Sequence, residues 1–122
     1  MPYEIVERDG TRIAVISGGA AQIRDASSAL DLAMSIRYET GISRLAIAKE
    51  AVCEEFFILS TGVAGEILQK FINYQFKAAI YGDYSRYTSK PLRDFIRESN
   101  RGRDFFFVPT REEAIQRLKE IQ

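Results

Sequence analysis

The segment Gly82–Lys90 carries the densest set of polar functional groups in the chain. Its nine residues include one carboxylate, two phenols, three hydroxyls and two cations: Asp83, Tyr84, Ser85, Arg86, Tyr87, Thr88, Ser89 and Lys90. A loop with so many hydrogen-bonding groups is typical of a ligand or partner site. The same segment has a purely local interpretation, in which Asp83 closes an Asx turn, Ser89 caps a helix and the tyrosines pack with hydrated hydroxyls. Both interpretations stay open.

A second candidate site lies at Ser60, Thr61 and Gly62, which precede an apolar pattern of helical period. The free N–H groups and the positive dipole end of a helix start favour an anion or a phosphoryl group. The alternative is that Ser60 or Thr61 caps the helix. Gly62 and Gly65 complete no standard phosphate-binding loop. Glu66 is expected to be exposed, with a buried acid or a cap partner as alternatives.

Basic residues concentrate between Lys70 and Arg103, where eight bases against three acids give a net charge of +5. Four of them share one face of a helix predicted after Ser89: Lys90, Arg93, Arg97 and Arg101. This face can bind nucleic acid, a phosphorylated ligand or an acidic protein surface, or it can be a solvated face with Lys90–Asp94 and Glu98–Arg101 ion pairs. Nucleic acid is disfavoured because the whole chain has seventeen bases and seventeen acids and no known nucleic-acid-binding pattern.

The composition excludes most familiar catalytic sites. The chain has no histidine and one cysteine, Cys53, so it lacks the commonest general base and metal ligand and can form no internal disulfide. Cys53 stands beside Glu54 and Glu55, where a thiol is structural rather than nucleophilic. We therefore expect no catalytic residue, no cofactor and no metal, with oxygen-only metal sites as the one exception.

The length of 122 residues predicts a single domain over residues 1–122. No run of eighteen apolar residues occurs, and Met1–Asp9 is too polar for a signal peptide. We expect a cytoplasmic protein without membrane contact.

Alternating strands and helices must position these residues. Asp9-Gly10 between two alternating apolar runs predicts an antiparallel hairpin. A helix between Asp25 and Gly41 is predicted to turn six residues inward: Ala26, Ala29, Leu30, Ala33, Met34 and Tyr38. The later strands are predicted at 45–48, 76–81 and 105–108, and the later helices at 61–74, 89–100 and 110–121. The segment 49–60 receives no assignment.

This order, ββαβαβαβα, predicts an α/β fold with a single mixed, mainly parallel sheet that opens with the antiparallel hairpin. Sites in such sheets lie at the carboxyl ends of the parallel strands. The segment ending at Thr61 and the segment 82–89 each follow a parallel strand, so we expect them to meet at one edge of the sheet. We also expect Phe106 to be buried.

Four segments carry a family resemblance: Ser60-Thr-Gly-Val-Ala-Gly-Glu66, Gln69-Lys70, Gly82-Asp-Tyr-Ser85 and Leu92-Arg-Asp-Phe-Ile-Arg-Glu-Ser-Asn100. With the element order, they resemble a bacterial family described only as domain of unknown function 4180, over nearly the whole chain. The element order is also similar to the STAS domains of anti-sigma factor antagonists, which use a Ser-containing loop before a helix as a regulated surface. Here the corresponding loop is Leu59-Ser60-Thr61-Gly62, without the Asp of the antagonists' Asp-Ser-Ser-Gly.

Two functions follow as hypotheses. The first is a non-enzymatic, STAS-like regulatory module that binds a protein partner or a small ligand through Ser60–Gly65 and Asp83–Arg93, with a homodimer allowed. The second is a small enzyme or an anionic small-molecule binder with a pocket between Ser60–Gly65 and Gly82–Lys90. A deep pocket uniting the two segments favours the second, and a flat patch favours the first.

Overall fold

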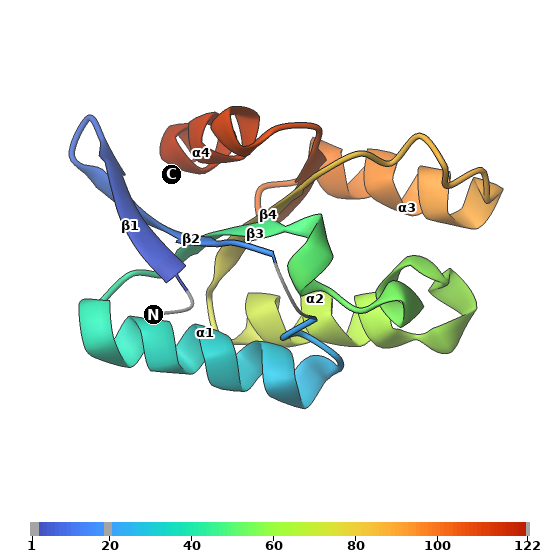
Figure 1. The fold of residues 1–122 in the computed structure, drawn as a ribbon, viewed down its shortest axis with the longest axis horizontal. Helices are drawn as coiled ribbons and strands as arrows, with labels where there is room; N and C mark the ends of the chain where they lie inside the picture. The colour runs from blue at the N-terminus through green and yellow to red at the C-terminus, as the bar shows by residue number, and fades with distance from the viewer. Residues whose placement is uncertain (1–2, 19–20, 122) are drawn as a thin grey trace.

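The computed structural model describes residues 3–18 and 21–121, so residues 1, 2, 19, 20 and 122 of the predicted domain lie outside its description. The strands in these ranges are β1 (Tyr3–Arg8), β2 (Thr11–Ile16), β3 (Arg44–Ala48), β4 (Lys77–Tyr81) and β5 (Phe105–Val108). The helices are α1 (Ala26–Thr40), α2 (Val63–Asn73), α3 (Lys90–Arg101) and α4 (Arg111–Glu120) (Figure 1). The predicted order of strands and helices is confirmed.

The β1–β2 hairpin turns at the predicted residues. Asp9 and Gly10 have φ of 52° and 84°, the left-handed conformations that a two-residue hairpin turn requires. The hairpin pairs Tyr3 with Ile16 at one end and Arg8 with Thr11 at the other. This turn fixes which face of β1 points into the core.

The five strands form one mixed sheet in the order β1-β2-β3-β4-β5. β1 is antiparallel to β2 and all other neighbours are parallel, which confirms the predicted sheet. α1 and α2 cover one face and α4 covers the other (Figure 1). α3 packs beside β5 on the α1 side, because Leu92 and Phe95 join the same apolar cluster as Phe105 and Phe107.

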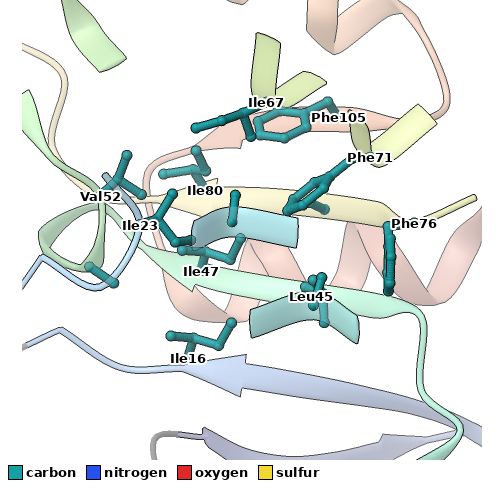
Figure 2. Close-up of a cluster of buried hydrophobic side chains, with 14 of the residues drawn as sticks. Ile16, Ile23, Leu45, Ile47, Val52, Ile67, Phe71, Phe76, Ile80 and Phe105 are labelled. Carbon is teal, nitrogen blue, oxygen red and sulfur yellow. The ribbon is translucent and has the colours of Figure 1, made fainter. Parts of the chain in front are cut away.

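The core has a layer on each face of the sheet. On the α1–α2 side, the ring of Phe71 lies 5.7 Å from that of Phe76 and 6.0 Å from that of Phe105 (Figure 2). On the other side, Phe106 packs with the apolar face of α4 and is buried as predicted. β5 is therefore covered on both faces, which explains its uninterrupted apolar sequence.

The predicted inward face of α1 is partly wrong. Met34 is 39% exposed and Tyr38 is 92% exposed, whereas Ala29, Ala33 and Ile36 are buried. The two alanines let the helix approach the sheet closely, and this contact rotates Met34 and Tyr38 away from it. The predicted boundaries hold, because Asp25 caps α1 by accepting from Ser28 N–H and Gly41 ends it at φ 79°.

The second helix begins close to its predicted start near Thr61 or Gly62, since Gly62 is its N-cap. α2 begins at Val63, and the residues before it form short 3-10 turns at Lys49–Ala51, Glu54–Phe57 and Leu59–Thr61. Three turns of three or four residues have no repeating apolar period, which is why the pattern of 49–60 allowed no assignment.

Candidate functional site

The segments that follow β3 and β4 lie side by side at the carboxyl edge of the sheet. Gly82 follows β4 directly, and a side chain at this position would begin 2.6 Å from Lys49 Cβ. Real Cβ atoms do not approach so closely, so a glycine is required for Lys49 and the start of the 82–89 loop to pack together. The segment after β3 and the 82–89 loop thus meet at Lys49, whereas no hydrogen bond among the described residues joins Ser60, Thr61 or Gly62 to the loop.

An aromatic cluster joins the two segments. The buried Phe57 contacts two tyrosines, with its ring centroid 5.1 Å from Tyr87 in a stacked arrangement and 6.1 Å from Tyr84. Lys49 Nζ lies 4.9 Å from the Tyr87 ring and 5.4 Å from the Phe57 ring, distances at which an ammonium is attracted by the aromatic face. The loop is therefore held to the 3-10 turns by packing.

Glu54 completes this junction from the polar side. Its carboxylate forms an ion pair with Arg86 and accepts a hydrogen bond of 3.1 Å from the Tyr87 hydroxyl. The Tyr87 hydroxyl also accepts from Arg86 at 3.0 Å, and together with Glu54 it raises the pKa of the Arg86 guanidinium. Arg86 is thus already paired with a carboxylate of its own chain.

The local interpretation of the loop is largely confirmed. Ser85 N–H donates to Asp83 Oδ1 at 2.9 Å, which closes the Asx turn and lowers the pKa of Asp83. Ser89 caps α3 by accepting from Leu92 N–H. The expectation of hydrated phenols is wrong for Tyr84, whose hydroxyl donates to the Ile80 carbonyl at 2.7 Å. Burial raises the pKa of Tyr84 far above its ordinary value, so this phenol is held protonated.

The Ser60 segment has a different geometry from the one predicted. The Thr61 hydroxyl donates to the carbonyls of Glu55 and Ile58 at 2.7 and 2.8 Å and accepts weakly from Val63 N–H. Gly62, at φ 82°, is the residue before the helix, so the predicted cap by Ser60 or Thr61 is wrong. Ser60 is exposed in the 3-10 turn.

Glu66, in the first turn of α2, is exposed as expected. None of the four predicted residues of this segment lines the groove described next: Ser60, Thr61, Gly62 and Glu66.

Three of the four bases on the basic face of α3 form ion pairs within the helix. Asp94 accepts from Lys90 at 2.7 Å and from Arg97 at 2.6 Å, and these bonds, the one from Lys90 first, lower the pKa of Asp94. Arg101 pairs with Glu98 at 3.4 Å. The two predicted ion pairs are confirmed. Arg93 is the exception on this face, since within residues 3–18 and 21–121 no hydrogen bond or ion pair involves its side chain.

An open groove of about 510 Å³ lies between the loop and α3. It is lined by Tyr84, Ser85, Tyr87, Thr88, Arg93 and Ile96. A smaller depression of about 330 Å³ adjoins it along α3, lined by Lys90, Arg93, Asp94 and Arg97. Arg93 belongs to both, so the unpaired guanidinium stands where the two hollows meet.

The chain matches the family described as "Domain of unknown function (DUF4180)" over residues 8–118. It belongs to this family. A search of curated proteins and a search of solved structures each found no match. Membership in DUF4180 thus agrees with the resemblance seen in the sequence, while the STAS likeness rests on element order.

The residues that join the site of this DUF4180 domain were only partly visible in its sequence. Lys49, Glu54 and Phe57 hold the loop in place, yet they lie in the segment that had no assignment. Only the order of the strands could have pointed to these three residues, because adjacent parallel strands bring the residues after β3 beside those after β4.

Within the described ranges of the DUF4180 domain, no group of three or more acidic or cysteine side chains could hold a metal ion. No described helix has the length and apolar character needed to cross a membrane.

Proposed function

We propose that this DUF4180 domain is a non-enzymatic binding module whose groove between the 84–88 loop and α3 binds an acidic segment of a protein partner. The observation that carries the proposal is Arg93. Its neighbours Arg86, Lys90 and Arg97 are all paired with carboxylates, whereas Arg93 stands unpaired among the described residues at the rim of an aromatic groove. A guanidinium in that position is suited to a carboxylate from outside.

The groove combines charge with apolar surface. Tyr84, Tyr87 and Ile96 provide rings and an aliphatic side chain, and Ser85 and Thr88 provide hydroxyls. Interfaces between proteins are enriched in tyrosine and arginine because both contribute large contact areas with polar ends. This lining supports a partner segment that has an acidic residue next to an apolar one.

The polar groups of the loop argue for binding rather than catalysis. The Tyr84 hydroxyl is bonded to a backbone carbonyl, Asp83 is bonded within its turn and Arg86 is bonded to Glu54. A general acid or base must exchange a proton with a substrate, and each of these groups is committed to the fold. The STAS-like order of elements supports a regulatory role.

The groove also lacks the form expected of a deep small-molecule site. All six lining residues come from the single stretch 84–96, and none comes from the Ser60–Gly65 segment. A pocket that united the two segments would have supported the competing small-molecule hypothesis. The Ser60–Gly62 turn stays a prediction as a second contact for the same partner.

The test is partner capture followed by cross-linking. Wild-type protein, Arg93→Glu and Arg103→Glu are used to capture partners from a bacterial lysate, and a zero-length carbodiimide reagent then links lysines to nearby carboxylates. We expect wild type and Arg103→Glu, a charge change outside the groove, to capture the same partner and to link Lys90 to one of its acidic residues. Arg93→Glu should lose this partner.

Equal capture by all three proteins would contradict the proposal. Inorganic phosphate is the second probe. If it binds at Arg93 but does not displace the captured protein, the groove binds a small anion and not a protein segment.

A further inference from the structure

The sheet has two edges, β1 and β5, and the described residues cover them differently. At β5, the side-chain amide of Asn100 bonds to both backbone groups of Phe107 and so occupies the outer edge. At β1, the opposite edge of the sheet, no described residue supplies backbone hydrogen bonds to the outer side. A strand with unpaired backbone groups is a template for another strand.

The hairpin geometry shows which groups of β1 face outward. Beside a two-residue turn, the flanking residues form a hydrogen-bonded pair, so Arg8 and then every second residue bond to β2. Ile5 and Glu7 therefore direct their N–H and C=O groups outward. In agreement, the Glu7 carbonyl accepts from the Arg8 guanidinium at 3.3 Å and not from β2.

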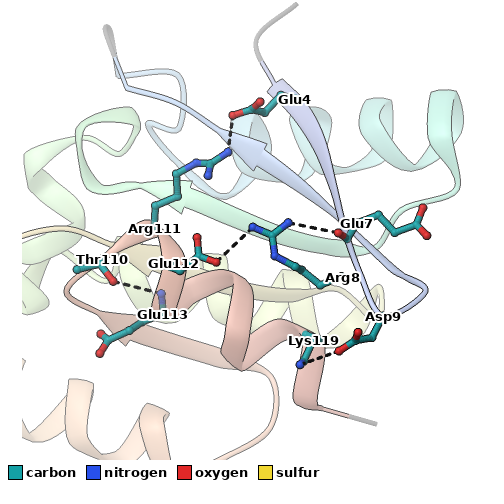
Figure 3. Close-up of polar contacts among 9 residues, drawn as sticks. All are labelled: Glu4, Glu7, Arg8, Asp9, Thr110, Arg111, Glu112, Glu113 and Lys119. Carbon is teal, nitrogen blue, oxygen red and sulfur yellow. Dashed lines mark hydrogen bonds and ion pairs between the residues drawn. The ribbon is translucent and has the colours of Figure 1, made fainter.

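Three ion pairs join the outer strand and its turn to α4 (Figure 3). Glu4 pairs with Arg111 at 2.5 Å, Arg8 pairs with Glu112 at 3.2 Å, and Asp9 in the turn pairs with Lys119 at 3.0 Å. These pairs come from both ends of α4 and both ends of β1. An edge fixed in this way loses little conformational freedom when it pairs with another strand.

We propose that β1 pairs antiparallel with β1 of a second copy of this chain, so that the two sheets become one. The commitment to a second copy comes from charge complementarity. In an antiparallel dimer, the outward-facing residues of one β1 must form the hydrogen-bonded pairs with those of the other. Several registers satisfy this rule, and they differ in the residue through which the two-fold axis passes. The register with the axis at Val6 places Glu4 opposite Arg8 of the second copy. The two-fold axis repeats this contact, so the pairing gains two unlike-charge contacts.

The neighbouring registers lack this match. Centring the axis on Ile5 places Glu4 opposite Val6, and centring it on Glu7 places the two Glu7 side chains opposite each other. Like charges directly opposite are unfavourable in an antiparallel pair. Of the registers centred on Ile5, Val6 and Glu7, the Val6 register is therefore the one that places unlike charges opposite each other.

This register also extends the existing ion pairs into rows that cross the interface. Each row reads Arg111, Glu4, then Arg8 and Glu112 of the second copy, so its charges alternate in sign. On the opposite face of the strand, Ile5 is 45% exposed in one chain, and it would meet the aliphatic part of Glu7 of the second copy. The pairing thus covers an exposed apolar side chain and the four outward backbone groups of Ile5 and Glu7 in each chain, and in it the N–H of Ile5 of the second copy replaces the Arg8 guanidinium on the Glu7 carbonyl.

Sedimentation of the full chain over a dilution series tests the dimer. We expect wild type to reach twice the mass of one chain. Glu4→Arg and Arg8→Glu each place like charges opposite one another twice, and each should raise the dissociation constant by about tenfold or more. Mixing the two variants restores both unlike pairs in the heterodimer, so the mixture should regain the dimer that neither variant forms alone.

Two further variants separate edge pairing from general effects on the hairpin. Ile5→Pro removes an outward N–H and should leave a folded monomer, because proline is tolerated where an edge N–H faces solvent. Lys119→Glu breaks an ion pair of the same hairpin without touching its outer edge, and it should leave the dimer unchanged. A wild type that stays monomeric throughout the series overturns the proposal, as does a mixture that fails to dimerise.

Discussion

The side chain of Asn100 makes both backbone hydrogen bonds that a neighbouring strand would make to Phe107. Asn100 Nδ2 donates to the Phe107 carbonyl at 3.1 Å, and Asn100 Oδ1 accepts from the Phe107 N–H at 2.7 Å. The residue sits in the last turn of α3, so the helix closes the edge of the strand that follows it. Arg117 of α4 donates to the Asn100 carbonyl at 2.8 Å and ties the second layer to the same point.

Asn100→Ala should destabilise the fold by about 1 to 3 kcal/mol, because two backbone groups of β5 lose their partners in a half-buried place. Asn100→Asp should cost at least as much, since its carboxylate faces the Phe107 carbonyl without a donor. Urea titration measures both. Asn73→Ala, which removes an exposed hydrogen bond from Gln69 on α2, is the matched control and should change stability by less than about 0.5 kcal/mol. Equal losses of stability for Asn100→Ala and Asn73→Ala would show that the Asn100 side chain does not stabilise the edge of β5.

Gly82→Ala tests the close approach of the segments after β3 and β4. The added methyl group would begin 2.6 Å from Lys49 Cβ, so the backbone must shift, at a cost of about 1 to 3 kcal/mol. Gly65→Ala is the matched control, because a Cβ in this part of α2 meets nothing within 4 Å. The control should stabilise the protein by about 0.5 to 1 kcal/mol through helix propensity. Thermal unfolding should therefore move in opposite directions for the two variants.

Tyr84 should give the protein a sensitivity to alkaline pH. Burial raises the pKa of Tyr84 in the folded state above the ordinary value of about 10. Once the pH exceeds the ordinary pKa, the unfolded chain loses the phenolic proton while the folded chain keeps it. The free energy of unfolding therefore falls as pH rises. Below the ordinary value both states are protonated and this effect is absent.

Tyr84→Phe should reduce the alkaline fall and should also lower stability at neutral pH by about 0.5 to 1.5 kcal/mol, because the bond to the Ile80 carbonyl is lost. Part of the fall should persist, since the pKa values of Tyr3 and Tyr81 are also raised. Urea titrations at neutral and alkaline pH measure it. An identical pH profile for wild type and Tyr84→Phe would show that this phenol ionises normally.

The sequence predicted the turns and helix starts that depend on residues close to one another in the chain. Asp9-Gly10 sets the hairpin, and Asp25 and Ser89 start their helices, because each residue acts on backbone groups within three positions of itself. The choice of buried face on α1 was not local. Two apolar stripes compete on this helix, and periodicity could not show that the sheet would take the stripe containing Ile36 and leave Tyr38 exposed.

The candidate site followed the same division. The Asx turn at Asp83 is a contact within three residues and was one of the two interpretations that the sequence allowed. The bond from Thr61 to the Glu55 carbonyl spans six residues and was not predicted. Glu54 and Phe57 pair with residues about thirty positions away, so only the order of the strands could have pointed to them.

Phe106 tests the layer under α4, which is the thinner of the two sides of the core. The ring is 1% exposed and packs with the apolar side of a single helix, so Phe106→Ala should cost about 3 to 5 kcal/mol in urea titration.

The guanidinium of Arg117 lies 4.2 Å from the centre of the Phe106 ring, and it holds the Asn100 carbonyl at the same time. Phe106→Leu keeps most of the apolar volume but removes the aromatic face from Arg117. It should therefore recover most of the loss while remaining about 0.5 to 1 kcal/mol below wild type. In an Arg117→Met background that residual difference should vanish, because no cation is left to distinguish a ring from an aliphatic side chain. If the difference in stability persists in this background, it arises from the shape of the ring and not from its contact with Arg117.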